Sequence, residues 1–290
     1  MSTKLTFLGT GTSQGVPIIA CDCPVCRSTD PRDKRYRASA LVEYGGLTIL
    51  IDGGPDMRSQ LLREGVHHLD AVLLTHNHKD HTGGLDDLRS FNLLEGKPVN
   101  IYCEQYVEDT LHREYAYCFA EPHYPGSPEW RMNTIDGSHP FRVYSNAWED
   151  RLEWISGKGY TRTPSGISRE DVHSVEVVPI QGWHNKAGTL SVLGYRFGGI
   201  AYLTDMCRLE DSELEKLRGL DAVTLNCVKR GTHFSHFSLP EVLDLFEKIG
   251  ARESYITHLS HMLPCHAEFE AELPEHVHPA YDGLTLISNE

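Results

Sequence analysis

Residues 76–81 read His-Asn-His-Lys-Asp-His, which places three imidazoles and one carboxylate within six positions. They directly follow the apolar run 71–74, predicted to be a buried strand, and they precede Gly83 and Gly84. Imidazole and carboxylate groups bind zinc, manganese or iron, and alternate residues leaving a strand can face one ion while the next turn faces another. The motif therefore predicts a metal centre at the end of a strand.

The rest of the chain alternates between predicted strands and predicted helices. Short apolar, β-branched runs predict buried strands at 5–8, 47–51, 71–74, 175–180, 200–203, 222–225 and 254–256. Helical periodicity falls between them, at 56–64, 211–218 and 239–249. This mixture predicts a layered α/β domain, and we expect a single domain over residues 1–290.

One local pattern, a strand followed by Thr and then by His or Asp, occurs three times. It places His76, Asp205 and His258 at the ends of three predicted strands. Since strand ends on one edge of a sheet can converge, we expect these side chains to belong to one site.

The motif of residues 76–81 resembles the His-x-His-x-Asp-His signature of the metallo-β-lactamase superfamily, without a substitution. The resemblance implies the αβ/βα four-layer sandwich fold and two adjacent metal ions bridged by an Asp. Carried onto this sequence, it implies His76, His78 and His184 for one ion, Asp80, His81 and His258 for the other, and Asp205 as the bridge. Asp52 matches a family Asp that orients ligating histidines, and a turn-forming Asp before two glycines is the alternative interpretation.

Two divalent ions about 3.5–4 Å apart lower the pKa of a water between them and hold the attacking and leaving oxygens in line. The resemblance therefore implies a metal-dependent hydrolase in which a hydroxide bridging the two ions attacks the substrate. Asp80 and Asp205 are the carboxylates assigned to this chemistry. Zinc, manganese and iron all suit these ligands.

A second cluster of candidate ligands lies near the N-terminus, where Cys21, Cys23 and Cys26 supply three thiolates within six residues. Soft ligands of this kind favour a closed, structural zinc site, and the alternative is an irregular loop with reduced thiols. The spacing is more typical of a metal site in a reducing compartment than of a disulfide framework. The remaining cysteines are interpreted as small buried apolar residues: Cys103, Cys118, Cys207, Cys227 and Cys265.

This cysteine loop resembles that of the PhnP-type phosphodiesterases, a group within the same superfamily. The resemblance implies that the fourth zinc ligand is His261, three residues after His258. It also implies hydrolysis of a cyclic phosphodiester on a phosphorylated ribose or a similar nucleotide. A pyrroloquinoline quinone synthesis relative has a similar loop but a degraded catalytic motif, so the intact motif here favours hydrolysis.

The sequence departs from the PhnP-type pattern where that group has a catalytic His, because Lys229 stands there. Leaving-group protonation or phosphate binding is therefore assigned to Lys229, His233 or His236. For each of these residues, the alternative interpretation is an exposed polar side chain.

Acidic residues exceed basic ones, 41 Asp and Glu against 27 Lys and Arg, for a formal net charge of −14. We expect a small anionic phosphodiester as substrate and no nucleic-acid polymer, because phosphate backbones are bound by basic surfaces. The charge also disfavours a tRNA-processing nuclease of this superfamily. Since no apolar run of about 18 residues and no leader segment occur, we expect no membrane contact and a cytoplasmic location.

The range 102–171 is rich in aromatic residues, Pro and Gly, unlike its surroundings. It predicts an aromatic-rich insertion within the single domain. A peripheral subdomain, a homodimer contact and a lid over the active site are alternative roles for it.

Two other functions remain open at this point. The same chemistry could attack a carbonyl, which would make the protein a carboxylic-ester, lactone or thioester hydrolase. The protein could also be a non-catalytic binding module that its metals brace, although complete ligand sets with room for water favour an enzyme.

Overall fold

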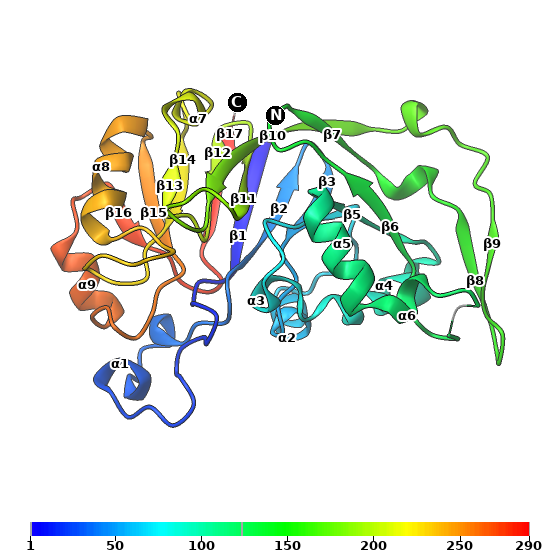
Figure 1. Ribbon diagram of the computed structural model, residues 1–290, viewed down its shortest axis with the longest axis horizontal. Helices are drawn as coiled ribbons and strands as arrows, with labels where there is room; N and C mark the ends of the chain where they lie inside the picture. The colour runs from blue at the N-terminus through cyan, green and yellow to red at the C-terminus, as the bar shows by residue number, and fades with distance from the viewer. Residues whose placement is uncertain (1, 123, 290) are drawn as a thin grey trace.

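The computed structural model describes residues 2–122 and 124–289. Two large sheets pack face to face, with helices on the outer side of each (Figure 1). The first sheet has seven strands, in the order β17 (Thr285–Asn289), β1 (Ser2–Gly9), β2 (Ser39–Tyr44), β3 (Leu47–Ile51), β4 (Ala71–Leu73), β5 (Val99–Cys103) and β6 (Trp130–Thr134).

The second sheet has eight strands and runs in the order β13 (Arg208–Leu209), β10 (Ser174–Trp183), β11 (Ser191–Phe197), β12 (Ile200–Tyr202), β14 (Ala222–Asn226), β15 (Glu253–Thr257) and β16 (Val277–Pro279). Strand β7 (Phe141–Tyr144) pairs with β10 and completes it. Strands β12, β14 and β15 are parallel neighbours, so their carboxyl ends lie at one edge of the sheet.

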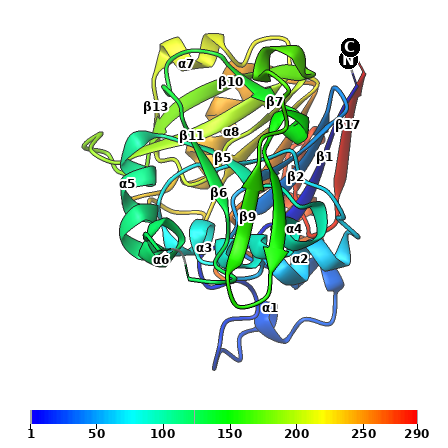
Figure 2. The same cartoon turned by 90° about the vertical axis from the view of Figure 1, so that its right-hand side faces the viewer.

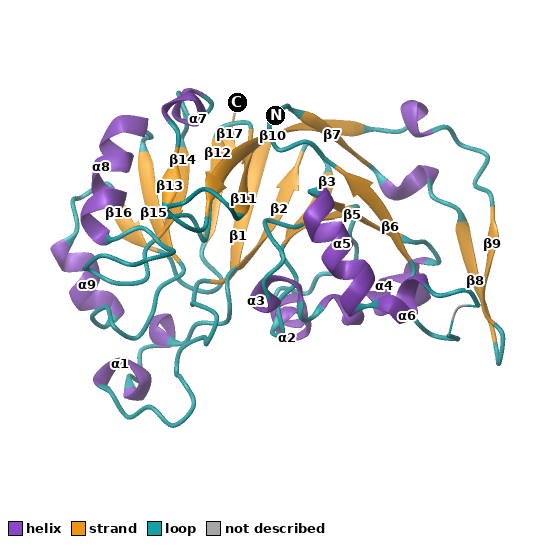
Figure 3. Ribbon diagram, viewed as in Figure 1, coloured by secondary structure: helices purple, strands orange, loops and turns teal. Residues whose placement is uncertain are grey.

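The helices fall into two groups, best seen in Figure 3. Beside the first sheet lie α2 (Met57–Arg63), α3 (Lys79–Thr82), α4 (Arg89–Glu95), α5 (Gln105–Glu114) and α6 (Ala116–Phe119). Beside the second sheet lie α7 (Asp211–Glu215), α8 (Leu239–Ile249) and α9 (His266–Glu272), and α1 (Pro24–Arg27) belongs to a loop that projects from the body.

Three clusters of buried apolar side chains hold the layers together. One contains Phe7 and Ile49 from the first sheet together with Tyr195 and Phe197 from the second, so it fills the space between the sheets. The other two clusters join each sheet to its own helices. The four-layer α/β sandwich predicted from the sequence is therefore confirmed.

Most predicted elements lie within a few residues of the observed ones, because the buried strands are apolar on both faces and the helices carry clear end signals. Helix α8 begins at a capping box, in which Ser238 and Glu241 satisfy each other's backbone N–H groups, and it ends at Gly250 with φ of 67°. Strand β10 is longer than predicted, since its second half continues the pairing with β11 as far as Trp183.

The range 102–171 is not set apart from the two large sheets. It supplies β6 to the first sheet and β7 to the second, and only the hairpin of β8 (Arg151–Ile155) and β9 (Gly159–Thr163) forms a separate two-stranded sheet. The hairpin stands at the end of the molecule far from α8 and α9 and faces the viewer in Figure 2. That this range is an insertion relative to other members of the superfamily stays a prediction.

Among the described residues, no helix is both long and apolar enough to cross a membrane.

A histidine joins the end of α4 to the start of β4. His68 lies 3.2 Å from Asp70 and 2.9 Å from Glu95, and these contacts raise its pKa to about 10. The two carboxylates also accept hydrogen bonds from the backbone of Thr48 and Leu69. His68 is therefore charged in the folded protein at neutral pH.

We predict that replacing His68 with Gln destabilises the protein most below about pH 6.5, the ordinary pKa of an unfolded His. Because the folded pKa is raised, the contribution is fully present below that pH and is lost as the pH rises towards 10. The side chain is 46% exposed, so about 1 kcal/mol or less is expected at pH 6. Urea unfolding of both proteins from pH 6 to pH 9 measures the difference, and a difference independent of pH would contradict this account.

Candidate metal centre

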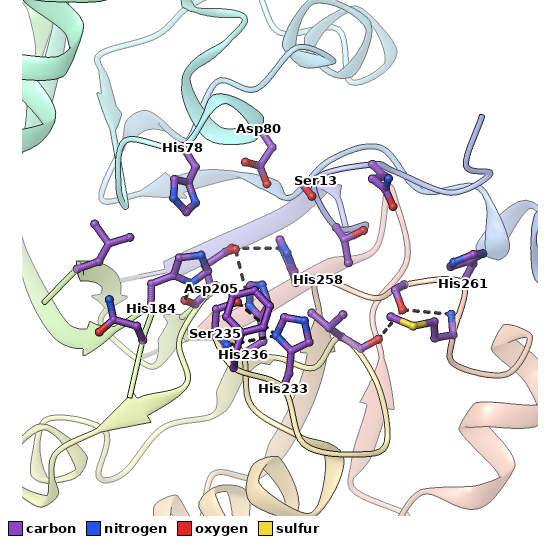
Figure 4. Close-up of a pocket in the computed structure, with 18 of the residues that line it drawn as sticks. Ser13, His78, Asp80, His184, Asp205, His233, Ser235, His236, His258 and His261 are labelled. Carbon is purple, nitrogen blue, oxygen red and sulfur yellow. Dashed lines mark hydrogen bonds and ion pairs between the residues drawn. The ribbon is translucent and has the colours of Figure 1, made fainter. Parts of the chain in front are cut away.

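The predicted convergence of strand ends occurs between the two sheets. His76 follows β4 of the first sheet, whereas Asp205 and His258 follow β12 and β15 of the second sheet. His184 follows the long strand β10. Figure 4 shows His184, Asp205 and His258 facing His78 and Asp80 across a cavity.

The chain bends sharply at several of these positions. Asp52, Asp205 and His258 all have φ between 56° and 60°, a left-handed conformation that side chains with a Cβ rarely adopt. Such strain costs of order 1–3 kcal/mol per residue and tends to collect at functional sites. Here it turns each strand end so that its polar side chain points into the space between the sheets.

One donor set consists of His76, His78 and His184, whose ligand atoms lie within 4.8 Å of one another. The remaining ring nitrogens of two of them have fixed partners. His184 Nδ1 lies 2.6 Å from the backbone oxygen of Asp205, and His76 Nδ1 lies 2.9 Å from Thr75 Oγ1. These contacts fix the rings and leave the Nε2 atoms for a ligand.

A second donor set consists of Asp80, Asp205 and His258, again within 4.8 Å. His81 belongs beside it, because its Nε2 lies 3.3 Å from Asp80 Oδ2 and 3.2 Å from Asp205 Oδ2. Asp205 also groups with His76 and His81, so it lies between the two sets. This is the placement expected for a carboxylate shared by two ions.

Asp52 contacts the ring nitrogen of His81 that faces away from the donor set. The Asp52 carboxylate is fully buried and lies 2.7 Å from His81 Nδ1, and it accepts hydrogen bonds from the backbone and hydroxyl of Thr75. A carboxylate in this position orients the imidazole and raises its basicity as a ligand. Asp52 has a φ of 60°, but residues 52–54 form no regular turn, so its contact with His81 is the better description.

The donors fit divalent cations. His76 Nε2 is buried, and within the described residues it has no hydrogen-bond partner, although buried polar atoms normally have one. His81 Nε2 and His258 Nδ1 are also buried, and their nearest polar neighbours are carboxylates of the donor sets. Burial also lowers the pKa of His258, and it lowers the pKa of His76 well below its usual value, so both rings are neutral and able to ligate. Bound cations would satisfy these nitrogens.

The cavity above the donors has a volume of about 560 Å³. His233 and His236 line it, as the sequence predicted, and they lie beside His258 in Figure 4. Lys229 is not among the described residues that line the cavity. None of the described residues of 102–171 lines it either, and the lid, subdomain and homodimer roles of this range stay predictions.

The cysteine loop forms a separate donor cluster with His261. The Sγ atoms of Cys21, Cys23 and Cys26 lie 3.2, 3.5 and 3.7 Å from His261 Nδ1. Backbone N–H groups also point at sulfur, from Ile18 to Cys26 and from Cys26 to Cys23. Three thiols and one imidazole around a common point fit a tetrahedral zinc ion.

Several residues of the site carried no signal in the sequence. Asn226, at the end of β14, exchanges two hydrogen bonds with the backbone of Met206 and so holds the turn next to Asp205. Ser13, Phe234 and Met262 line the cavity. Phe234 and Met262 adjoin the predicted site residues His233 and His261, whereas Ser13 adjoins none of the predicted motifs.

We predict that Cys23→Ser removes one metal ion per chain and also lowers hydrolytic activity, since His261 and His258 belong to one short segment that serves both donor clusters. Metal analysis of the purified variant measures the first effect. Cys265→Ser is the matched control, because Cys265 packs beside the cluster but is not one of its four donors. Unchanged metal content in Cys23→Ser would refute the site.

The chain resembles known proteins over its full length. The octanoyltransferase of Porphyromonas gingivalis is 38% identical over 289 residues, which cover 99% of this chain and 52% of that protein. The chain thus spans about half the length of that curated relative.

Solved structures share the fold. A structure described as a new diphosphatase from the PhnP family is 35% identical, with a TM-score of 0.80, and covers 99% of this chain and 98% of its own. The zinc-bound PqqB of Methylobacterium extorquens has a TM-score of 0.66 at 20% identity, over 98% of this chain and 99% of its own, so it supports the fold alone. The family model of the β-lactamase superfamily domain matches residues 48–259, which include every member of the two His and Asp donor sets. The chain therefore belongs to the β-lactamase superfamily and has the metallo-β-lactamase fold.

Proposed function

We propose that the protein is a metal-dependent hydrolase that cleaves a phosphodiester bond in a small substrate. The observation that carries the proposal is the pair of donor sets joined by Asp205 at the base of an open cavity. The likeness to a PhnP-family diphosphatase over nearly the whole chain supports a substrate that reacts at phosphorus.

Two divalent cations in these donor sets would supply an activated water and neutralise charge on the phosphoryl oxygens. The chain itself holds the ligand side chains in fixed orientations before any substrate binds. Asp52 holds the ring of His81, and the backbone oxygen of Asp205 holds that of His184. Preorganised groups of this kind need no rearrangement when charge develops during the reaction.

His236 is the best-placed group for a hydrogen bond to the substrate. Its ring lies beside those of His184 and His258, and its buried Nδ1 lies 3.9 Å from Asp205 Oδ1. This nitrogen has no hydrogen-bond partner among the described residues. A neutral imidazole there can donate one N–H to a phosphoryl or leaving-group oxygen.

His233 lies farther out on the same loop. Its Nδ1 accepts a hydrogen bond from the backbone of Ser235 at 3.3 Å, which leaves the proton on Nε2. We assign His233 a supporting role, as a second donor to the substrate. Lys229 takes no part in this assignment.

We predict that Asp205→Ala lowers the rate of bis(p-nitrophenyl) phosphate hydrolysis by more than about 100-fold, because it removes the donor shared by both sets. Loss of a residue that only supports a metal ligand costs up to about 100-fold, and loss of a shared donor should cost more. His236→Ala should lower kcat while metal content stays unchanged. The matched control is Asp211→Ala, which alters an exposed carboxylate at the start of α7. Full activity in Asp205→Ala would contradict the role of Asp205 as the shared donor, whereas no hydrolysis by the metal-loaded native protein would leave only a binding module braced by metals.

A second candidate substrate is a diphosphate linkage, which the description of the PhnP-family structure favours. The same donors would serve, since attack again occurs at phosphorus, and only the leaving group differs. The curated relative raises a third option, an acyl ester.

These options predict different rates on three substrates assayed side by side. We expect bis(p-nitrophenyl) phosphate to be hydrolysed with a kcat/KM above that for p-nitrophenyl octanoate, because the shared donors suit charge on phosphoryl oxygens. A dinucleoside diphosphate tests the second candidate, and preference for it would replace the phosphodiester. Hydrolysis of the octanoate ester alone would contradict both.

A further inference from the structure

Apolar side chains from separate loops lie at the mouth of the cavity. Ile18, Phe234 and Met262 line it, and we call these three residues the apolar rim. Phe234 is 80% exposed and Met262 is 55% exposed. Exposed apolar area beside a polar site is typical of ligand-binding surfaces, since covering it on binding is favourable.

One face of the Phe234 ring is covered by His233, and most of the rest of the side chain is exposed. Its ring stacks on His233, with centroids 4.6 Å apart and planes inclined by 27°. His233 is itself held by the backbone and hydroxyl of Ser235. Because the Phe234 side chain is largely exposed, it offers a flat apolar surface to a planar group bound in the cavity.

The rim is tied to the cysteine cluster. Ile18 donates its backbone N–H to Cys26 Sγ at 3.4 Å, and Met262 directly follows His261. Two of the three rim residues therefore belong to loops that the proposed zinc ion would hold in place. The positions of these two rim residues would therefore be fixed by the fold around the proposed zinc ion.

Cationic side chains are missing from the cavity. Among the described residues that line it there is no Lys or Arg, although Asp80 and Asp205 are present. Of the cations on neighbouring loops, Lys79 is paired with Glu114 and Lys186 with Glu241, while Lys229 adjoins Val228 but does not itself line the cavity. A second phosphate group beyond the metal donors would find no Lys or Arg among the described lining residues to pair with.

We propose that the substrate carries an uncharged substituent with an aromatic ring, such as a nucleobase, which binds on Phe234, and that it carries no second phosphate group. This inference rests on the proposed function, in which the metal donors hold the phosphoryl centre. It differs from the phosphorylated ribose that the PhnP-type resemblance implies, because that substrate needs a second anion site. Phe234 is then a specificity-determining residue, and Ile18 and Met262 flank the ring.

Calorimetry on the metal-loaded protein tests the inference without turnover. The probes are methyl phosphate, n-butyl phosphate, thymidine 5′-monophosphate and thymidine 3′,5′-bisphosphate. We expect the 5′-monophosphate to bind about tenfold or more tightly than methyl phosphate, within the range for one base stacked on an aromatic side chain. The bisphosphate should bind no more tightly than the monophosphate.

Variants separate stacking from general binding. In Phe234→Ala, the ratio of the thymidine 5′-monophosphate affinity to the methyl phosphate affinity should fall towards one. Phe234→Trp should preserve that ratio, because a ring remains. Leu94→Ala is the matched control, since it removes an exposed apolar side chain of α4 that does not line this cavity.

Three outcomes would overturn the inference: equal affinities for methyl phosphate and the 5′-monophosphate, tighter binding of the bisphosphate, or butyl phosphate binding as tightly as the nucleotide. The last would indicate a rim that selects apolar groups in general. Failure of the proposed function is distinguishable from all three, because it would appear as absent hydrolysis of bis(p-nitrophenyl) phosphate whatever the binding series shows.

Discussion

The carboxylate of Asp205 is the element on which the site depends. It lies within reach of His81 and His258 at 3.2 Å each, and it also groups with His76 and with His184. Burial raises the pKa of Asp205, but the contact with His81, whose own pKa is raised well above its usual value, helps to hold the pKa of Asp205 well below its usual range. An ionised carboxylate in this buried position needs positive charge around it, which two cations would supply. The packing of the two sheets is what brings its partners together.

Close backbone approach fixes the motif loop against the rest of the site. A Cβ added at Gly54 would lie 1.9 Å from the backbone oxygen of Asp80, and one added at Gly84 would lie 2.1 Å from that of Gly54. The glycines that flank the motif are therefore a steric requirement. They allow the loop to pack against the segment at Asp52, so that Asp52 can reach His81.

The two donor clusters share one wall. The segment that begins at His258 also carries His261 and Met262, and it therefore links the catalytic donors, the cysteine cluster and the apolar rim. An ion bound by the cysteine cluster and His261 would hold this segment in place without itself belonging to the His and Asp donor sets.

The sequence by itself determined the layered α/β class, the approximate bounds of the apolar strands and the candidate donors that the structure brings together, because hydrophobic periodicity and clustered ligands are local signals. The repeated Thr before a donor has a partial explanation in the structure, where Thr75 bonds Asp52 and Thr204 bonds Asp205.

Only the tertiary structure decided that Asp205 lies between both sets, that Asn226 holds the turn beside it, and that Phe234 and Met262 line the same cavity. It also decided that Lys229 lies outside the lining and that 102–171 contributes strands to the main sheets. These facts depend on which strand ends become neighbours across two packed sheets. That is a property of long-range packing, which no local pattern of residues records.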